Sequence, residues 1–207
     1  MSNVGIRKDQ MLQEKEQYPA QSALHDTHSI YGWISILLHW VTAVVIIVLW
    51  FIGKSIMTVD PENVDAQRQL HVSIAASAWL VILIRVYWRF RSGHPRINGQ
   101  TLLIHRIAKT AHYAMLIATA LMLVSGPMMV WSGGHPIAIF SLLSIPGPFD
   151  EAESIRDFAR FVHTNTAWFL FWMVLLHIGG ALKHLMFHND DTIARMIWPG
   201  RQKTGAR

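Results

Sequence analysis

Residues 161–187 read FVHTNTAWFLFWMVLLHIGGALKHLMF, and this stretch decides the fold. It exceeds the about 20 mostly apolar residues that a helix needs to cross a bilayer, yet it contains His163 and His177. An ionisable side chain inside a membrane is costly and usually has a function. Fourteen residues make close to four helical turns, so the two imidazoles fall near one helix face, about 21 Å apart along the axis. The stretch therefore predicts a membrane helix that offers one imidazole at each of two depths.

The composition is that of a small membrane protein. Of the 207 residues, 52% are hydrophobic and only 15% are charged, which is unusual for a soluble domain. The chain has no cysteine, and this excludes disulfides, thiolate metal sites and cofactors attached through cysteine. The net charge is +5, but the basic residues flank apolar spans instead of forming a stripe on a polar fold. We therefore exclude nucleic acid as a partner.

Four stretches are long enough to span a bilayer, and they define an all-α membrane bundle. We place them at residues 34–53, 70–90, 107–131 and 161–187. The third span contains Pro127, which lacks an N–H, so the carbonyl one turn earlier needs another donor from a neighbouring group. A loop at residues 133–153 follows, and its apolar part, residues 137–145, is too short to span and is expected to lie along the membrane interface.

The charges of the connections give the orientation. The N-terminal tail, the segment from Arg85 to Lys109, and the segment from Lys183 onward hold fourteen of the eighteen Lys and Arg residues. The positive-inside rule then places both termini in the cytoplasm. We predict three parts: a weakly ordered cytoplasmic extension (residues 1–30), the four-helix transmembrane domain (31–198) and a cytoplasmic tail (199–207). The four other basic residues lie on the two periplasmic connections, beside seven acids: Lys54, Arg68, Arg156 and Arg160.

Two more histidines lie inside the earlier spans. His39 lies in the first turns of span one, on the cytoplasmic side, and His71 in the first turn of span two, on the periplasmic side. Span four starts from the periplasm, so His163 is shallow there and His177 lies deeper. Depth therefore pairs His71 with His163, and His39 with His177. Two such pairs predict two non-covalently bound haems b, each clamped by two imidazoles, an arrangement that favours electron transfer over oxygen binding.

One further pattern supports these four ligands. Each is followed one turn later by an alanine, which leaves room for a flat macrocycle, although small residues are also common where membrane helices touch. The alanines are Ala43, Ala75, Ala167 and Ala181.

The residues leave several alternatives open. In one alternative, the four histidines only make polar contacts between helices. In another, they form a proton relay in a transporter without redox chemistry. His112, at the start of span three, binds a haem propionate, lines a quinone pocket or sits in the membrane interface. A further alternative has His184 as the ligand in place of His177. Its distance from His163 argues against this, because it would push both haems into the headgroups. Arg85 and Arg89, one turn apart, pair with haem propionates or anchor the span at the interface.

The ordered set of motifs resembles the bacterial cytochrome b561 family, related to the di-haem b subunits of nickel hydrogenases and formate dehydrogenases. The matching pieces, spread over residues 31–198, include ILLHW at 36–40, LHVS at 70–73, RVYWR at 85–89, AHY at 111–113 and LH at 176–177. The resemblance implies two haems b on the same four histidines, with electrons passing from a periplasmic donor to membrane ubiquinone.

One branch of this family is similar to a superoxide:ubiquinone oxidoreductase. If this protein were such an oxidoreductase, its four periplasmic basic residues would receive superoxide. The alternative is an electron-transfer subunit that serves a separate periplasmic dehydrogenase or cytochrome. The seven acids beside the basic residues would repel an anion, so the donor is left open between a small molecule and a protein.

Overall fold

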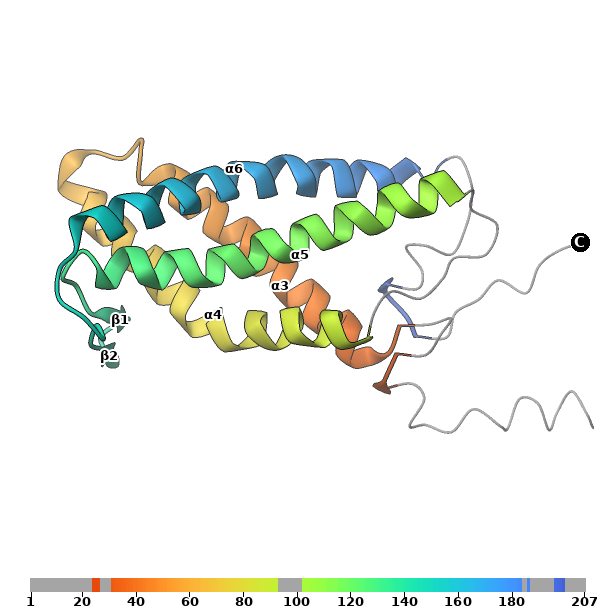
Figure 1. Ribbon diagram of the computed structural model, residues 1–207, viewed down its shortest axis with the longest axis horizontal. Coiled ribbons are helices and arrows are strands. Elements are labelled where there is room, and N and C mark those ends of the chain that lie inside the picture. Colours follow the sequence, from red (N-terminus) through yellow and green to blue (C-terminus); the bar gives the residue numbers. More distant parts are fainter. Residues whose placement is uncertain (1–23, 27–30, 93–101, 184–185, 187–195, 200–207) are drawn as a thin grey trace, which may run out of the picture.

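The computed structural model describes residues 24–26, 31–92, 102–183, 186 and 196–199. Within them lie four long helices: α3 (Trp33–Ser55), α4 (Val64–Ser92), α5 (Leu102–Trp131) and α6 (Glu153–Lys183) (Figure 1). All four are long and apolar enough to cross a membrane, which confirms the four predicted spans. Most of the predicted N-terminal extension, most of the tail after Trp198 and His184 lie outside the described residues.

A proline turn and charged side chains mark the ends of α4 and α6. The turn η1 (Pro61–Asn63) precedes α4, and its proline supplies the fixed φ that favours a helix start. Asp65 lies in the first turn of α4 and Arg89 in its last, which complements the helix dipole. Glu153 and Lys183 occupy the same positions on α6. These polar turns lengthen both helices at their N-termini beyond the apolar spans that hydropathy delimits.

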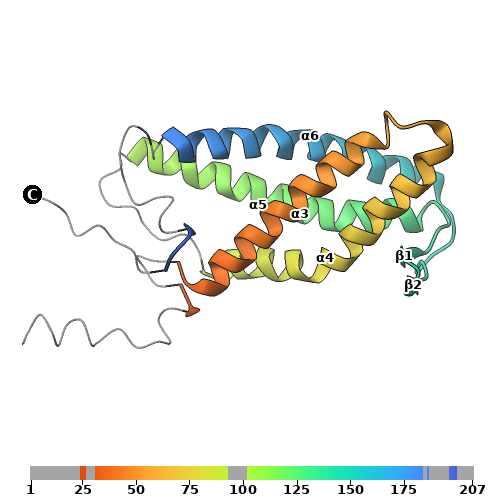
Figure 2. The same ribbon diagram turned by 180° about the vertical axis from the view of Figure 1, so that it is seen from behind.

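The helices pack as two pairs, α3 with α4 and α5 with α6, and α4 touches α5 less extensively. The α5 and α6 helices run side by side along the molecule (Figure 1), and α3 crosses the bundle diagonally (Figure 2). A small apolar core joins α4 to α5: Ile82, Val86, Leu116 and Leu123. The largest side chains that are fully buried are serines: Ser35, Ser73 and Ser132. The protein therefore fills little of its own interior with large side chains.

The Pro127 region confirms the prediction of an outside donor. Helix α5 continues through Pro127 to Trp131, so the carbonyl of Leu123, one turn earlier, loses its normal helical partner. The indole Nε1 of Trp79, on α4, donates to that carbonyl at 2.9 Å. This hydrogen bond ties α4 to α5 beside the apolar core.

A small hairpin follows α5, where the sequence suggested only an apolar loop. Strands β1 (Ile137–Ile139) and β2 (Leu143–Ile145) pair antiparallel, with Ile137 opposite Ile145. The buried hydroxyl of Ser73 on α4 donates to the carbonyl of Ala138 at 3.1 Å and accepts from the N–H of Phe140 at 2.8 Å. The hairpin is therefore fastened to the start of α4, two residues from His71. Its position at a membrane interface stays a prediction.

Candidate functional site

The structure brings the four predicted histidines together as two pairs. His39 of α3 and His177 of α6 have ring centroids 6.3 Å apart, and His71 of α4 and His163 of α6 have centroids 6.4 Å apart. These are the pairs that depth predicted. All four residues are half-buried. We call the two levels the His39 end and the His71 end; helix α6 contributes one histidine to each.

The spacing of both pairs fits one metal ion between two imidazoles. A ring nitrogen binds a first-row metal at about 2 Å, so imidazoles on opposite sides of one ion have centroids roughly 6 Å apart. No cluster of three or more metal-ligating side chains occurs among the described residues. The pairs therefore suit an ion that brings its other ligands with it, as haem iron does.

Helix α6 packs closely against α5 but not against α3 or α4. Helix α6 makes little backbone contact with α3 or α4, although its two histidines face theirs. In its most apolar stretch only 6% of the residues are buried inside the protein. The histidines of α6 therefore meet those of α3 and α4 where the helix backbones do not pack closely, and the residues present fit a haem at each level.

At the His71 end, small residues seat the rings. Ser125 Oγ lies 3.1 Å from His163 Nδ1. When Nε2 of a histidine binds a metal, Nδ1 carries the proton, so His163 would donate to this hydroxyl and be held in the ligand tautomer. A Cβ on Gly126 would lie 3.4 Å from Cε1 of His163, and a Cβ on Gly53 would lie 3.2 Å from Cε1 of His71. Both glycines thus leave the space that the rings occupy.

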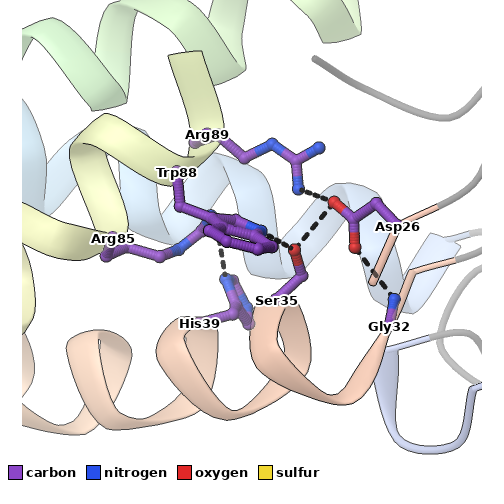
Figure 3. Close-up of polar contacts among 7 residues, drawn as sticks. All are labelled: Asp26, Gly32, Ser35, His39, Arg85, Trp88 and Arg89. Carbon is purple, nitrogen blue, oxygen red and sulfur yellow. Dashed lines mark hydrogen bonds and ion pairs between the residues drawn. The ribbon is translucent and has the colours of Figure 1, made fainter. Parts of the chain in front are cut away.

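At the His39 end, charged side chains lie near His39 (Figure 3). Arg85 Nη2 lies 3.5 Å from His39 Nδ1, a long contact. With Nε2 on a metal, Nδ1 would itself become a donor, so Arg85 would turn to another acceptor. Within the described part of the chain, Arg85 Nη1 and Arg89 Nε and Nη2 are buried without a hydrogen-bond partner. Unpaired guanidinium N–H groups beside a histidine fit a carboxylate such as a haem propionate.

Asp26 also belongs to this end, and sequence reasoning missed it. Its carboxylate lies 3.3 Å from Arg89 Nη1, and both side chains are 5% exposed. The same carboxylate accepts from Ser35 Oγ at 2.7 Å and from the N–H of Gly32 at 2.8 Å. Asp26 lies in a polar tail with no helical periodicity, so no local pattern in the sequence marks it.

His112 lies beside His177, at the same level. The centroids of the two rings are 5.2 Å apart, which is shorter than the roughly 6 Å expected for imidazoles on opposite sides of one ion. The distances therefore favour His39 over His112 as the partner of His177. His112 is half-buried and touches the site as a neighbour.

An aromatic cluster between α3 and α6 is a further element that sequence reasoning missed. Trp50 stacks on Phe171 with centroids 4.3 Å apart, and Trp168 meets both rings edge-on. On α6 these aromatics fall between His163 and His177 in sequence. They hold the two helices together between the two histidine pairs.

The basic residues predicted to receive electrons at the His71 end each make their own separate contacts. Arg68 pairs with Asp65 at 2.5 Å. Arg156 contacts three acids, with N–O distances of 3.3, 3.3 and 3.7 Å: Glu151, Glu153 and Asp157. Lys54 lies over the ring of Trp168, and Arg160 is exposed. These cations therefore lie on three different helices, α3, α4 and α6, and acids pair with two of the four.

The comparison with known proteins agrees with this geometry. A family model described as prokaryotic cytochrome b561 matches residues 30–199, a range that contains all four membrane helices and both histidine pairs. Cytochrome b561 homolog 2 of Escherichia coli (strain K12) is 29% identical over 178 residues, which cover 83% of this chain and 93% of that protein. The chain therefore belongs to the prokaryotic cytochrome b561 family, whose members are di-haem, four-helix membrane proteins that transfer electrons.

Proposed function

We propose that this protein carries electrons across the bacterial inner membrane through two haems b, from a periplasmic donor to ubiquinone in the bilayer. The observation that carries the proposal is that four histidines form two pairs at two levels of one bundle, with ring centroids 6.3 and 6.4 Å apart. His39 and His177 hold one haem, and His71 and His163 hold the other. Haem iron with both axial positions filled supplies one-electron transfer and does not bind oxygen.

The surrounding residues have distinct tasks in this proposal. Ser125 keeps the His163 ring in the ligand tautomer, and Gly53 and Gly126 leave the rings their space. Arg85 binds a propionate of the haem at the His39 end, through the N–H groups that lack protein partners. His112, against His177, contributes to a quinone site at the same level.

The charge distribution supports an orientation with the His39 end in the cytoplasm. The helix termini at that end carry Arg89 and Arg91 on α4 and Lys183 on α6. The connections at the His71 end carry four basic residues and seven acids. Under the positive-inside rule, the more basic end stays in the cytoplasm, so donors approach the His71 end.

The same charges bear on the donor. Superoxide is an anion, and the acids around Arg68 and Arg156 would repel it and neutralise both guanidinium groups. This favours a protein donor with a basic docking face, which makes the chain the membrane subunit of a periplasmic redox partner. The superoxide:ubiquinone oxidoreductase version requires Lys54 and Arg160 to attract the anion despite their neighbours.

The first experiment measures haem. We expect detergent-purified protein to contain two low-spin b haems per chain, seen in a reduced-minus-oxidised spectrum and by haem quantification. His177→Ala should lose the haem of the His39 end, and His71→Ala the haem of the His71 end. His135→Ala, an exposed loop histidine, is the matched control and should keep both. Colourless protein from haem-replete cells would refute the proposal and favour a transporter.

A second experiment separates the donors. Quinone reduction is followed with superoxide in one assay and with a basic, reduced c-type cytochrome in another. We expect reduction by the basic cytochrome that weakens as salt is raised, because salt screens the attraction of exposed charges. Superoxide-dependent reduction above the uncatalysed rate, without turnover of the cytochrome, would instead support the enzyme version.

A further inference from the structure

The segment before the first membrane helix is docked onto the His39 end. A Cβ on Gly32 would lie 2.4 Å from the carbonyl oxygen of Leu24, so only glycine permits this approach of the two backbones. His25 stacks on Trp88 with centroids 5.7 Å apart and an interplanar angle of 25°. Three consecutive residues, Leu24 to Asp26, are therefore in close contact with the start of α3 and the end of α4.

Asp26 is the centre of this contact (Figure 3). Its Oδ1 accepts from the N–H of Gly32, the N-cap residue of α3, as the glutamate of a capping box does from within a helix. Its Oδ2 accepts from Ser35, whose hydroxyl in turn accepts from Trp88 Nε1 at 2.8 Å. One carboxylate thus joins the first turn of α3 to the last turns of α4.

The same network adjoins the His39 site. Ser35 lies one turn before His39 on α3, and Arg89 lies one turn after Arg85 on α4. Asp26 is the acid that pairs with Arg89, and Arg85 contacts His39. Within this cluster, Arg85, Arg89 and Asp26 leave an excess of one positive charge, which the removal of Asp26 would double.

We propose that Asp26 is a positioning residue for the His39-end haem: its carboxylate holds Arg89 and the start of α3, and its charge lowers the potential of that haem alone. The inference rests on the proposed function, because it concerns one of two haems. Oxidised haem carries one more positive charge than reduced haem, so a nearby buried carboxylate stabilises the oxidised form. The other level lies about 21 Å away along α6, and the effect there is much weaker.

The test is a redox titration of the holoprotein, with the haem spectrum as readout. In Asp26→Asn, we expect one of the two titration components to move to higher potential and the other to stay where it is. Asp65→Asn is the matched control, since Asp65 also pairs with an arginine but is exposed, and neither component should move. The double variant Asp26→Asn, Arg89→Gln removes one charge of each sign, and its titration should return toward that of the unaltered protein.

Each outcome decides a separate point. Suppose that every variant keeps two haems. If neither potential changed in Asp26→Asn, or if both potentials changed equally, the inference would be overturned while the proposed function stands. If the unaltered protein contained no haem, the proposed function itself would fail. If Asp26→Asn lost one haem and the double variant regained it with its normal potential, the charge pairing would be supported. Loss of that haem from both variants would show that Asp26 supports the fold without acting through charge.

Discussion

Trp79→Phe is the substitution that tests the packing around Pro127 most directly. The indole N–H of Trp79 serves the Leu123 carbonyl that Pro127 leaves without a helical partner. Phenylalanine keeps most of the ring and removes the donor. The carbonyl would then face an apolar environment without a hydrogen bond, and the stretch that carries Ser125 and Gly126 would lose its hydrogen bond to α4.

The size of the effect follows from two estimates. Leaving a buried acceptor unsatisfied costs about 1–3 kcal/mol in soluble proteins. Hydrogen bonds between membrane helices are worth less, about 0.6 kcal/mol on average and about 1.7 at most. Pro127 blocks the usual local alternative for this carbonyl, so we expect a cost near the upper membrane value, about 1–1.5 kcal/mol.

A double-mutant cycle with Pro127→Ala isolates this contribution. Alanine at 127 supplies an N–H four residues after Leu123, so the carbonyl gains a normal helical partner. Trp79→Phe should then cost about 1 kcal/mol less in the Pro127→Ala background, because the packing lost from the indole is common to both arms and cancels. The free energy of unfolding is measured in detergent by denaturant titration with far-UV circular dichroism.

The reasoning would be refuted if Trp79→Phe cost the same in both backgrounds. Costs count as the same when they differ by no more than about 0.3–0.5 kcal/mol, the departure from additivity of independent sites. A stabilising effect of Trp79→Phe in the presence of Pro127 would also refute it. Either result would mean that the carbonyl finds another partner, and that the indole contributes only its area.

The remaining predictions concern the histidine pairs. Gly53→Val should cost up to one haem per chain, measured by haem quantification, because even its Cβ would lie 3.2 Å from the His71 ring. Gly126→Ala should keep most of the other haem, because its Cβ would lie 3.4 Å from the His163 ring. An equal loss of haem in both variants would contradict this ranking. His112→Ala should keep both haems and lower ubiquinone reduction at least about tenfold, as for the loss of a positioned acid or base; loss of a haem would instead make His112 a ligand.

Much of the architecture followed from hydropathy and spacing. The 20-residue requirement of the bilayer located all four spans, and the fourteen-residue spacing on α6 predicted two levels for imidazoles. Depth then selected the pairs that lie 6.3 and 6.4 Å apart. These inferences worked because a membrane imposes one length and one axis, so positions in sequence translate into depth. The role of these histidines as haem ligands still awaits the haem measurements.

Other contacts had no such signal. Ser73 is one of four serines in the predicted spans, and its contacts with the hairpin could be seen only in the folded structure. Asp26 lies outside the spans, and its partner Arg89 is 63 positions away in the chain. Such contacts depend on how a loop or a tail packs in three dimensions, which neither periodicity nor membrane thickness dictates.

The two levels differ in a way that bears on the direction of electron flow. At the His71 end, the groups against the rings are neutral: Ser125, Gly53 and Gly126. At the His39 end, two arginines face one aspartate, so the charged groups of that cluster sum to one positive charge. Excess positive charge favours the reduced form of a nearby haem and raises its potential. Electrons arriving at the His71 end would thus move downhill toward the His39 end, where His112 lies beside His177 and where we place the quinone. The asymmetry of these protein charges therefore supports the proposed direction of transfer, from the His71 end toward the His39 end.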